Sequence, residues 1–114
     1  LSGDSATLNM TNDNYLNGLT ISVTDLSLTG TCQIANYNVI INGDVVNNAV
    51  LQNRGGNFPL TVNGNFTNNG TVRQNPAGYA FYINISYDII NNGSWTNNQI
   101  ELIGTEQRIS CGAG

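Results

Sequence analysis

Ionisable side chains are scarce in this chain. It has no His and no Lys, and only 9% of its 114 residues are charged, against roughly 25% in ordinary globular proteins. Without His, the commonest general base and metal ligand is missing, and without Lys no Schiff base can form. We therefore expect a protein that is not an enzyme, with no catalytic residue, no cofactor and no bound metal.

Positive charge and long apolar runs are also scarce. The three Arg residues are scattered at positions 54, 73 and 108, and the net charge is −4. This argues against the basic surface that binds nucleic acid or an anionic membrane. The longest apolar run is five residues, Tyr79 to Ile83, which is too short for membrane insertion. No signal peptide is visible and the chain begins at Leu1, so we expect a mature or trimmed segment.

Asparagine is abundant, and it recurs within a repeat. The chain has 21 Asn, or 18% of its residues. Three stretches, 39–51, 60–72 and 83–95, share one pattern at offsets of 21 and 23 residues: apolar-x-apolar, a turn, Asp/Asn-apolar, Asn-Asn-Gly/Ala, x-apolar. A weaker copy lies 19 residues upstream. We expect a single domain, 1–114, with copies near 20–33, 39–53, 60–75 and 83–98 and partial coils at 6–17 and 99–110.

Each copy predicts one coil of a β-solenoid. The apolar residues alternate with a period of two, which is typical of short strands with one buried face. The Asn and Gly between them favour turns with positive φ. A single coil cannot bury its own apolar side chains, so coils stack. We predict an all-β fold, a parallel β-solenoid of about five coils of 19–23 residues.

Stacking brings equivalent positions of successive coils together. The alignment predicts two inward apolar columns: Leu26, Val45, Phe66 and Ile89 in one, and Cys32, Leu51, Val72 and Trp95 in the other. It also predicts two Asn ladders at the corners: Asn47, Asn68 and Asn91 in one, and Asn48, Asn69 and Asn92 in the other. Amides repeated at strand spacing can hydrogen-bond along a stack, which gives the excess of Asn a structural reason.

A β-sandwich of hairpins is the competing fold. Asn-Gly, the strongest short hairpin signal, occurs five times. A sandwich, however, gives no reason for the same apolar columns to recur every 19–23 residues. Its strands also usually run to about five or six residues. We therefore favour the solenoid.

Three segments carry a resemblance to a known group of proteins. NYLNGLTI (14–21), LTVNGNFTNNGTV (60–72) and GTEQRIS (104–110) resemble the right-handed parallel β-helix segments of large secreted bacterial surface proteins, often adhesin-like and most similar to those of the Bacteroidetes group. The resemblance covers most of 14–110, and departs from the pattern at Tyr87, which replaces Gly43 and Gly64, and at an insertion over 75–82. It implies a right-handed parallel β-helix at an extracellular or cell-surface location, but no ligand.

One column of the repeat carries acids, namely Asp25, Asp44, Asn65 and Asp88. Neighbouring coils would hold these side chains about 4.8 Å apart, and a Ca²⁺ ion between Asp25 and Asp44 would relieve their repulsion. The interpretation we prefer is that each Asp caps its own turn. A catalytic carboxylate pair for polysaccharide cleavage is disfavoured, because the acids are spread one per coil.

Aromatic residues cluster in the third copy. Tyr79, Tyr82 and Tyr87 suggest a sugar-stacking platform, and the alternative function is therefore a carbohydrate-binding module of a secreted polysaccharide-active protein. Its partner would be a polysaccharide or a cell-surface ligand. In the structural interpretation, Phe81 and Trp95 belong to the core, while Tyr79 and Tyr82 edge the insertion.

The two cysteines and the coil ends bear on assembly. Cys32 and Cys111 would lie roughly 18 Å apart along the axis, whereas a disulfide needs Cα atoms within about 7 Å. No cap for the terminal coils is visible in the sequence, so we expect continuation into a longer chain or self-association by axial stacking. Stacking would make an intermolecular Cys111–Cys32 disulfide possible, with two free thiols as the alternative. The preferred function is an extracellular spacer, adhesin segment or fibre subunit.

Overall fold

The computed structural model describes residues 2–10, 20–34, 38–53, 59–74, 81–96, 99–105 and 107–111. Within these ranges the chain forms strands joined by turns, with no helix. The strands are β1 (Ser2–Met10), β2 (Thr20–Ile34), β3 (Val39–Asn47), β4 (Val50–Asn53), β5 (Leu60–Val62), β6 (Phe66–Asn68), β7 (Thr71–Arg73), β8 (Tyr82–Ile85), β9 (Ile89–Asn91), β10 (Ser94–Thr96), β11 (Gln99–Leu102) and β12 (Ile109–Cys111).

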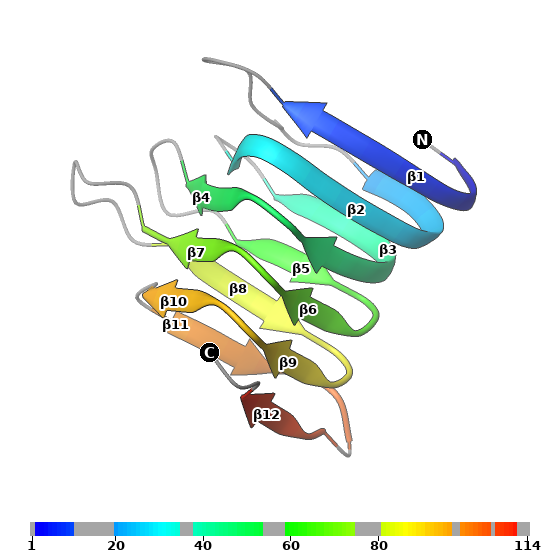
Figure 1. Ribbon diagram of the computed structural model, residues 1–114. Coiled ribbons are helices and arrows are strands. Elements are labelled where there is room, and N and C mark those ends of the chain that lie inside the picture. Colours follow the sequence, from blue (N-terminus) through cyan, green and yellow to red (C-terminus); the bar gives the residue numbers. More distant parts are fainter. Residues whose placement is uncertain are drawn as a thin grey trace.

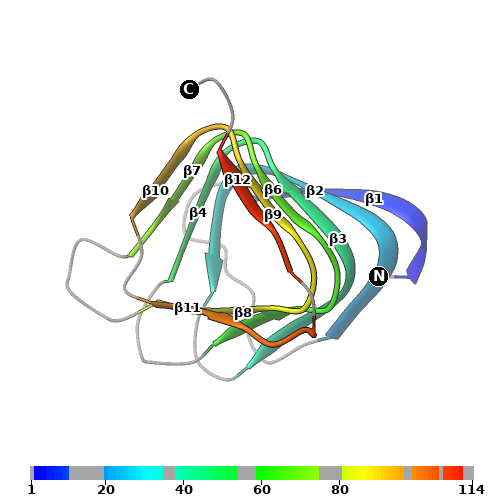
Figure 2. The ribbon, with the colours of Figure 1, turned by 90° about the horizontal axis from the view of Figure 1, so that it is seen from below.

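All the strand pairs are parallel, and they join residues about one repeat apart in the sequence. On one face β5, β8 and β11 follow the first part of β3, and on the second β6, β9 and β12 follow its last part. The third face consists of the end of β2 with β4, β7 and β10. Figure 2 looks along the axis and shows these three sides enclosing one interior.

The chain winds as a right-handed coil. In Figure 2 the path runs counterclockwise from β8 through β9 and β10 to β11 while it advances toward the viewer. Figure 1 shows the same turns stacked one below the other from the N-terminal end to the C-terminal end. This hand is the one that parallel crossover connections almost always adopt.

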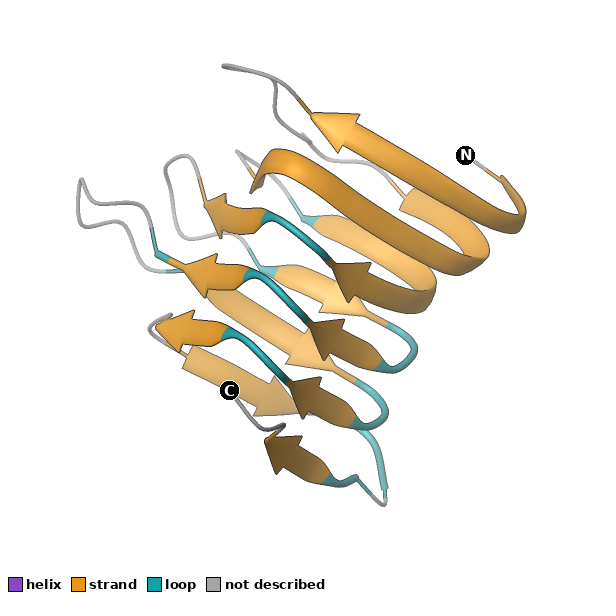
Figure 3. Ribbon diagram, in the orientation of Figure 1, coloured by secondary structure: helices purple, strands orange, loops and turns teal. Residues whose placement is uncertain are grey.

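The described residues form about three complete turns, 39–53, 60–73 and 82–96, stacked between β2 and the β11–β12 turn. Strand β2 bends through all three faces as one element and pairs with β1 on its other side. In turns 60–73 and 82–96, short loops separate the strands of the first, second and third faces (Figure 3), whereas β3 runs from the first face to the second as one strand. The predicted parallel solenoid is confirmed, with about three full turns and partial turns beyond them.

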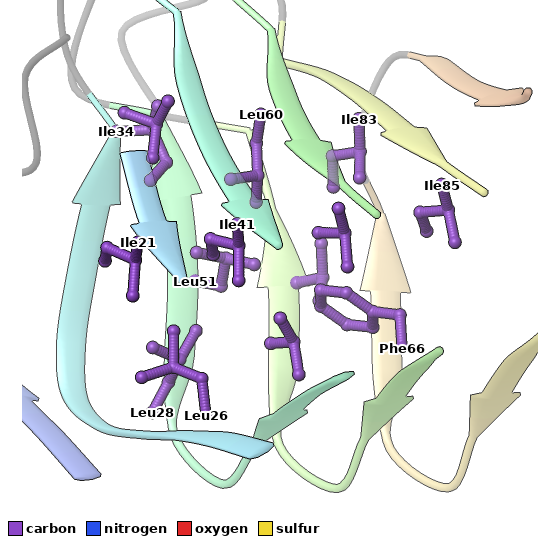
Figure 4. Packing of buried hydrophobic residues seen from close by; sticks show 14 of the residues in the cluster. Ile21, Leu26, Leu28, Ile34, Ile41, Leu51, Leu60, Phe66, Ile83 and Ile85 are labelled. Carbon is purple, nitrogen blue, oxygen red and sulfur yellow. The ribbon is translucent and has the colours of Figure 1, made fainter. Parts of the chain in front are cut away.

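The core consists of the inward side chains of successive turns (Figure 4). Ile21, Ile41, Val62 and Ile85 follow one another in register on the first face. On the second face the register runs through Leu26, Val45, Phe66 and Ile89. All of these side chains are buried. In these two columns, each buried side chain lies in register with apolar side chains of the adjacent described turns.

The third face carries the second predicted column. The register joins Cys32, Leu51, Val72 and Trp95. Leu51 and Val72 are buried, while Trp95 is half-buried at the edge of the core. The Trp95 ring packs edge-to-face on Phe66, with 5.1 Å between ring centroids and 62° between ring planes. Only the backbone of Cys32 is described, so its side chain lies outside this account.

Candidate functional sites at the corners and the C-terminal end

A buried Asn ladder runs along one corner. Asn47 donates from Nδ2 to Oδ1 of Asn68 at 2.9 Å, and Asn68 donates in the same way to Asn91 at 2.8 Å. Asn68 also donates to the Ser94 carbonyl at 2.9 Å and accepts from the Gly70 amide at 3.2 Å. Asn47 and Asn68 are fully buried, so these bonds supply the partners that buried amides require. Every side-chain donor in this ladder points toward the C-terminal end.

An exposed Asn ladder lies beside the buried one. Asn69 donates to Oδ1 of Asn48 at 3.0 Å, and Asn92 donates to Oδ1 of Asn69 at 2.9 Å. These donors point toward the N-terminal end, opposite to those of the buried ladder. Both ladders predicted from the repeat are therefore present.

A third ladder was not anticipated from the sequence. Asn42 donates to Oγ of Ser22 at 3.3 Å, Asn63 donates to Oδ1 of Asn42 at 2.8 Å, and Ser86 donates from Oγ to Oδ1 of Asn63 at 3.0 Å. The signal was the recurring Asn before Gly43 and Gly64, which sequence reasoning assigned to turn formation alone. The same Asn residues also link successive turns.

The acidic column binds backbone amides of the next turn. Oδ1 of Asp44 accepts from the Asn65 amide at 2.8 Å, Oδ1 of Asn65 from the Asp88 amide at 3.0 Å, and Oδ1 of Asp88 from the Arg108 amide at 2.9 Å. These side chains thus cap the following turn, whereas we expected each to cap its own. The side chain of Asp25 is not described. In the described part of the chain no three His, Cys, Asp or Glu residues gather as a metal site.

The ladders end at the last turn. Arg108 follows Asp88 in the acceptor column, and Cys111 follows Asn91 in the buried Asn column. Asn91 accepts from Asn68 but donates to no residue in the described ranges. The apolar columns instead continue, with Leu102 in register below Ile85 and Ile109 below Ile89. The last turn therefore presents apolar positions without a further ladder.

The tyrosines of the predicted platform are not brought together. Tyr82 is half-buried at the start of β8, and Tyr87 is exposed in the corner beyond the end of that strand. Tyr79 lies outside the described residues. The length of β8 therefore separates Tyr82 from Tyr87. Phe81 is buried in the core, as expected.

The cysteines lie on different faces. Cys32 pairs through its backbone with Leu51 on the third face, whereas Cys111 pairs with Asn91 on the second and carries an exposed free thiol. Four strand spacings separate them, about 19 Å, so no disulfide joins them within the chain. In a coaxial stack with β1 under β12, the neighbour's Cys32 would lie two spacings below Cys111, about 10 Å. Stacking in that register does not form the intermolecular disulfide.

Comparisons with protein-family models, with curated proteins and with solved structures find no match for this chain. Among the residues that the structure describes, no helix has the length and apolarity to cross a membrane.

Proposed function

We propose that this chain is a non-catalytic structural and interaction protein of the extracellular space, serving as a fibre subunit, adhesin segment or spacer that assembles by end-to-end stacking. The resemblance of 14–110 to the β-helix segments of secreted bacterial surface proteins, most of all those of the Bacteroidetes group, supports the extracellular location. The polar side chains of the ladders contribute to the link between one turn and the next.

The observation that carries the proposal is the exposure of the apolar columns at the last described turn. Ile89 is 2% exposed, whereas Ile109, one step further in the same column, is 58% exposed. Ile85 is 0% exposed, and Leu102 below it is 44% exposed. Burying these two side chains under another turn would be favourable by about 25 cal/mol per Å² of apolar surface removed from water.

A second copy of the chain fits this end. Strand β1 already occupies the column of Ile109 at the N-terminal end, where Ala6 is in register with Leu26. Placed under β12, Ala6 would continue the column of Ile109. Because all the strand pairs are parallel, only a head-to-tail arrangement continues the strand pairing, which gives an open, non-closing contact.

The charges at the two ends favour the same arrangement. Arg108 is exposed at the C-terminal end of the acidic column. At the N-terminal end, Ser5 is in register with Asp25 of that column, and Asp4 precedes it. Head-to-tail stacking would place Arg108 in register above Ser5 of the next copy, one residue from Asp4 in the sequence. Tail-to-tail contact would instead oppose two Arg108 side chains.

The test compares two isoleucines of similar exposure. Ile109→Asp places a charge in the inward column of the end, while Ile90→Asp places one on the outward face of the neighbouring strand β9, where the parent side chain is 41% exposed. Sedimentation velocity over a range of concentrations and negative-stain electron microscopy would measure assembly. We expect filaments or growing mass for the parent and for Ile90→Asp, and folded monomers for Ile109→Asp.

Circular dichroism would show that the variants keep their β-sheet spectrum. A parent chain that stays monomeric at every concentration would refute stacking between copies. Equal assembly of both variants would show that the contact does not use the exposed column.

A further inference from the structure

Two departures from the repeat meet at one corner of the solenoid. At the corner that joins the first face to the second, one position is Gly43 and Gly64 in two successive turns. In the next turn the same position is Tyr87. The same corner spans 63–65 and 86–88 in the middle turns but 103–108 in the last. In repeat proteins such local insertions gather on one face, which is often the binding face.

The longer corner borders an open hollow beside Tyr87. Asn63, Ser86, Tyr87, Gly104 and Thr105 line a space of about 360 Å³. This volume lies at the lower end of the roughly 300–1,000 Å³ that is typical of small-molecule sites. The Tyr87 side chain is 57% exposed, so part of the ring is open to a ligand.

The Gln107 side chain and a close backbone contact hold the walls of the hollow in place. Gln107 accepts from the Gly104 amide at 2.6 Å and donates to the Ile85 carbonyl at 2.8 Å. Gly104 packs so closely on the Ser86 carbonyl that a Cβ at this position would overlap the oxygen. The loop therefore lies directly on the turn above, and the hollow is formed before a ligand arrives, which lowers the entropic cost of binding.

The chemistry of the lining points to a neutral sugar. None of the five lining residues that the structure describes is charged. Ser86 and Thr105 offer hydroxyl groups, and Asn63 offers a carbonyl oxygen whose second lone pair remains after the bond from Ser86. Tyr87 adds an aromatic face with a polar tip. A pyranose has apolar C–H faces and a rim of hydroxyl groups, and so matches this combination.

We propose that this hollow is a binding subsite for one unit of an uncharged polysaccharide, with its C–H face on the Tyr87 ring and its hydroxyl groups on Ser86, Thr105 and Asn63. The subsite does not depend on end-to-end stacking. It also differs from the platform expected from the sequence, because Tyr82 lies at the far end of β8.

The experiment is a ¹H–¹⁵N correlation titration of the full chain. The probes are four neutral hexasaccharides, those of cellulose, laminarin, xylan and β-mannan, and one charged control, hexagalacturonate. We expect at least one neutral probe to shift the amide signals of 86–87 and 104–105. Tyr87→Ala should weaken that binding about tenfold, Tyr87→Phe should retain most of it, and Thr105→Val should weaken it without removing the ring.

The matched control is Tyr82→Ala, which removes an aromatic side chain from the other end of the same strand. It should leave the affinity unchanged. The proposal is overturned if no neutral probe shifts these signals, if only hexagalacturonate does, or if Tyr82→Ala weakens binding as much as Tyr87→Ala. Since Tyr87 is exposed and Thr105 lies on a surface loop, all the variants should keep the dispersed spectrum of the parent.

Discussion

The middle turns and the last turn place residues in the same inward columns, but these residues differ in how far they are buried. In turn 60–73, Phe66 and Asn68 are fully buried. In the last turn the equivalent positions are Ile109 and Cys111, and both are exposed. The comparison shows that burial in this fold depends on a neighbour on each side. Stability should therefore be close to a sum of contacts between adjacent turns.

The largest expected contrast is between Phe66 and Ile109. Phe66→Ala removes a buried ring that packs on Trp95, and should lower the free energy of unfolding by about 3–5 kcal/mol. Ile109→Ala, in the same column but exposed, should cost less than about 0.5 kcal/mol in the monomer. Urea denaturation followed by tryptophan fluorescence would measure both. An unchanged midpoint for Phe66→Ala would refute the column assignment.

The second contrast is between the two Asn ladders. Asn68→Ala would leave the buried Asn47 amide and the Ser94 carbonyl without this partner, and should cost about 2–3 kcal/mol. Asn69→Ala removes only exposed bonds and should cost about 0.5 kcal/mol or less. The same urea experiment measures both values. Equal losses would mean that burial does not distinguish the ladders.

The third contrast concerns how closely the turns approach at a corner. A Cβ on Gly70 would overlap the Ala49 carbonyl oxygen of the turn above, so Gly70→Ala should cost about 1–2 kcal/mol through a forced backbone shift. Ala49, one turn earlier in the repeat, already carries a Cβ. Ala49→Gly should cost only about 0.5–1 kcal/mol through chain entropy. Thermal unfolding by circular dichroism would compare them, and a stabilised Gly70→Ala variant would contradict the close approach.

The repeat spacing was sufficient to predict the interior. An offset of 21 residues pairs Val45 with Phe66 and Asn47 with Asn68, and the structure has these pairs. This succeeds because stacking is a simple translation from one turn to the next. The spacing does not determine the direction of an outward side chain at a corner. It therefore could not show that Asp44 caps the next turn, or that Gln107 bridges the loop 103–108 to the turn above.

The opposed donor directions of the two neighbouring Asn ladders have a consequence for length. A single column of aligned amides adds its dipoles and builds a moment that grows with each turn, as in a helix. Here the donors of Asn47 and Asn68 point one way, while those of Asn69 and Asn92 point the other way. The two moments largely cancel, so each added turn changes the net dipole of this corner little. The partial charges that each ladder leaves at its two ends therefore largely offset each other at this corner, whatever the number of turns.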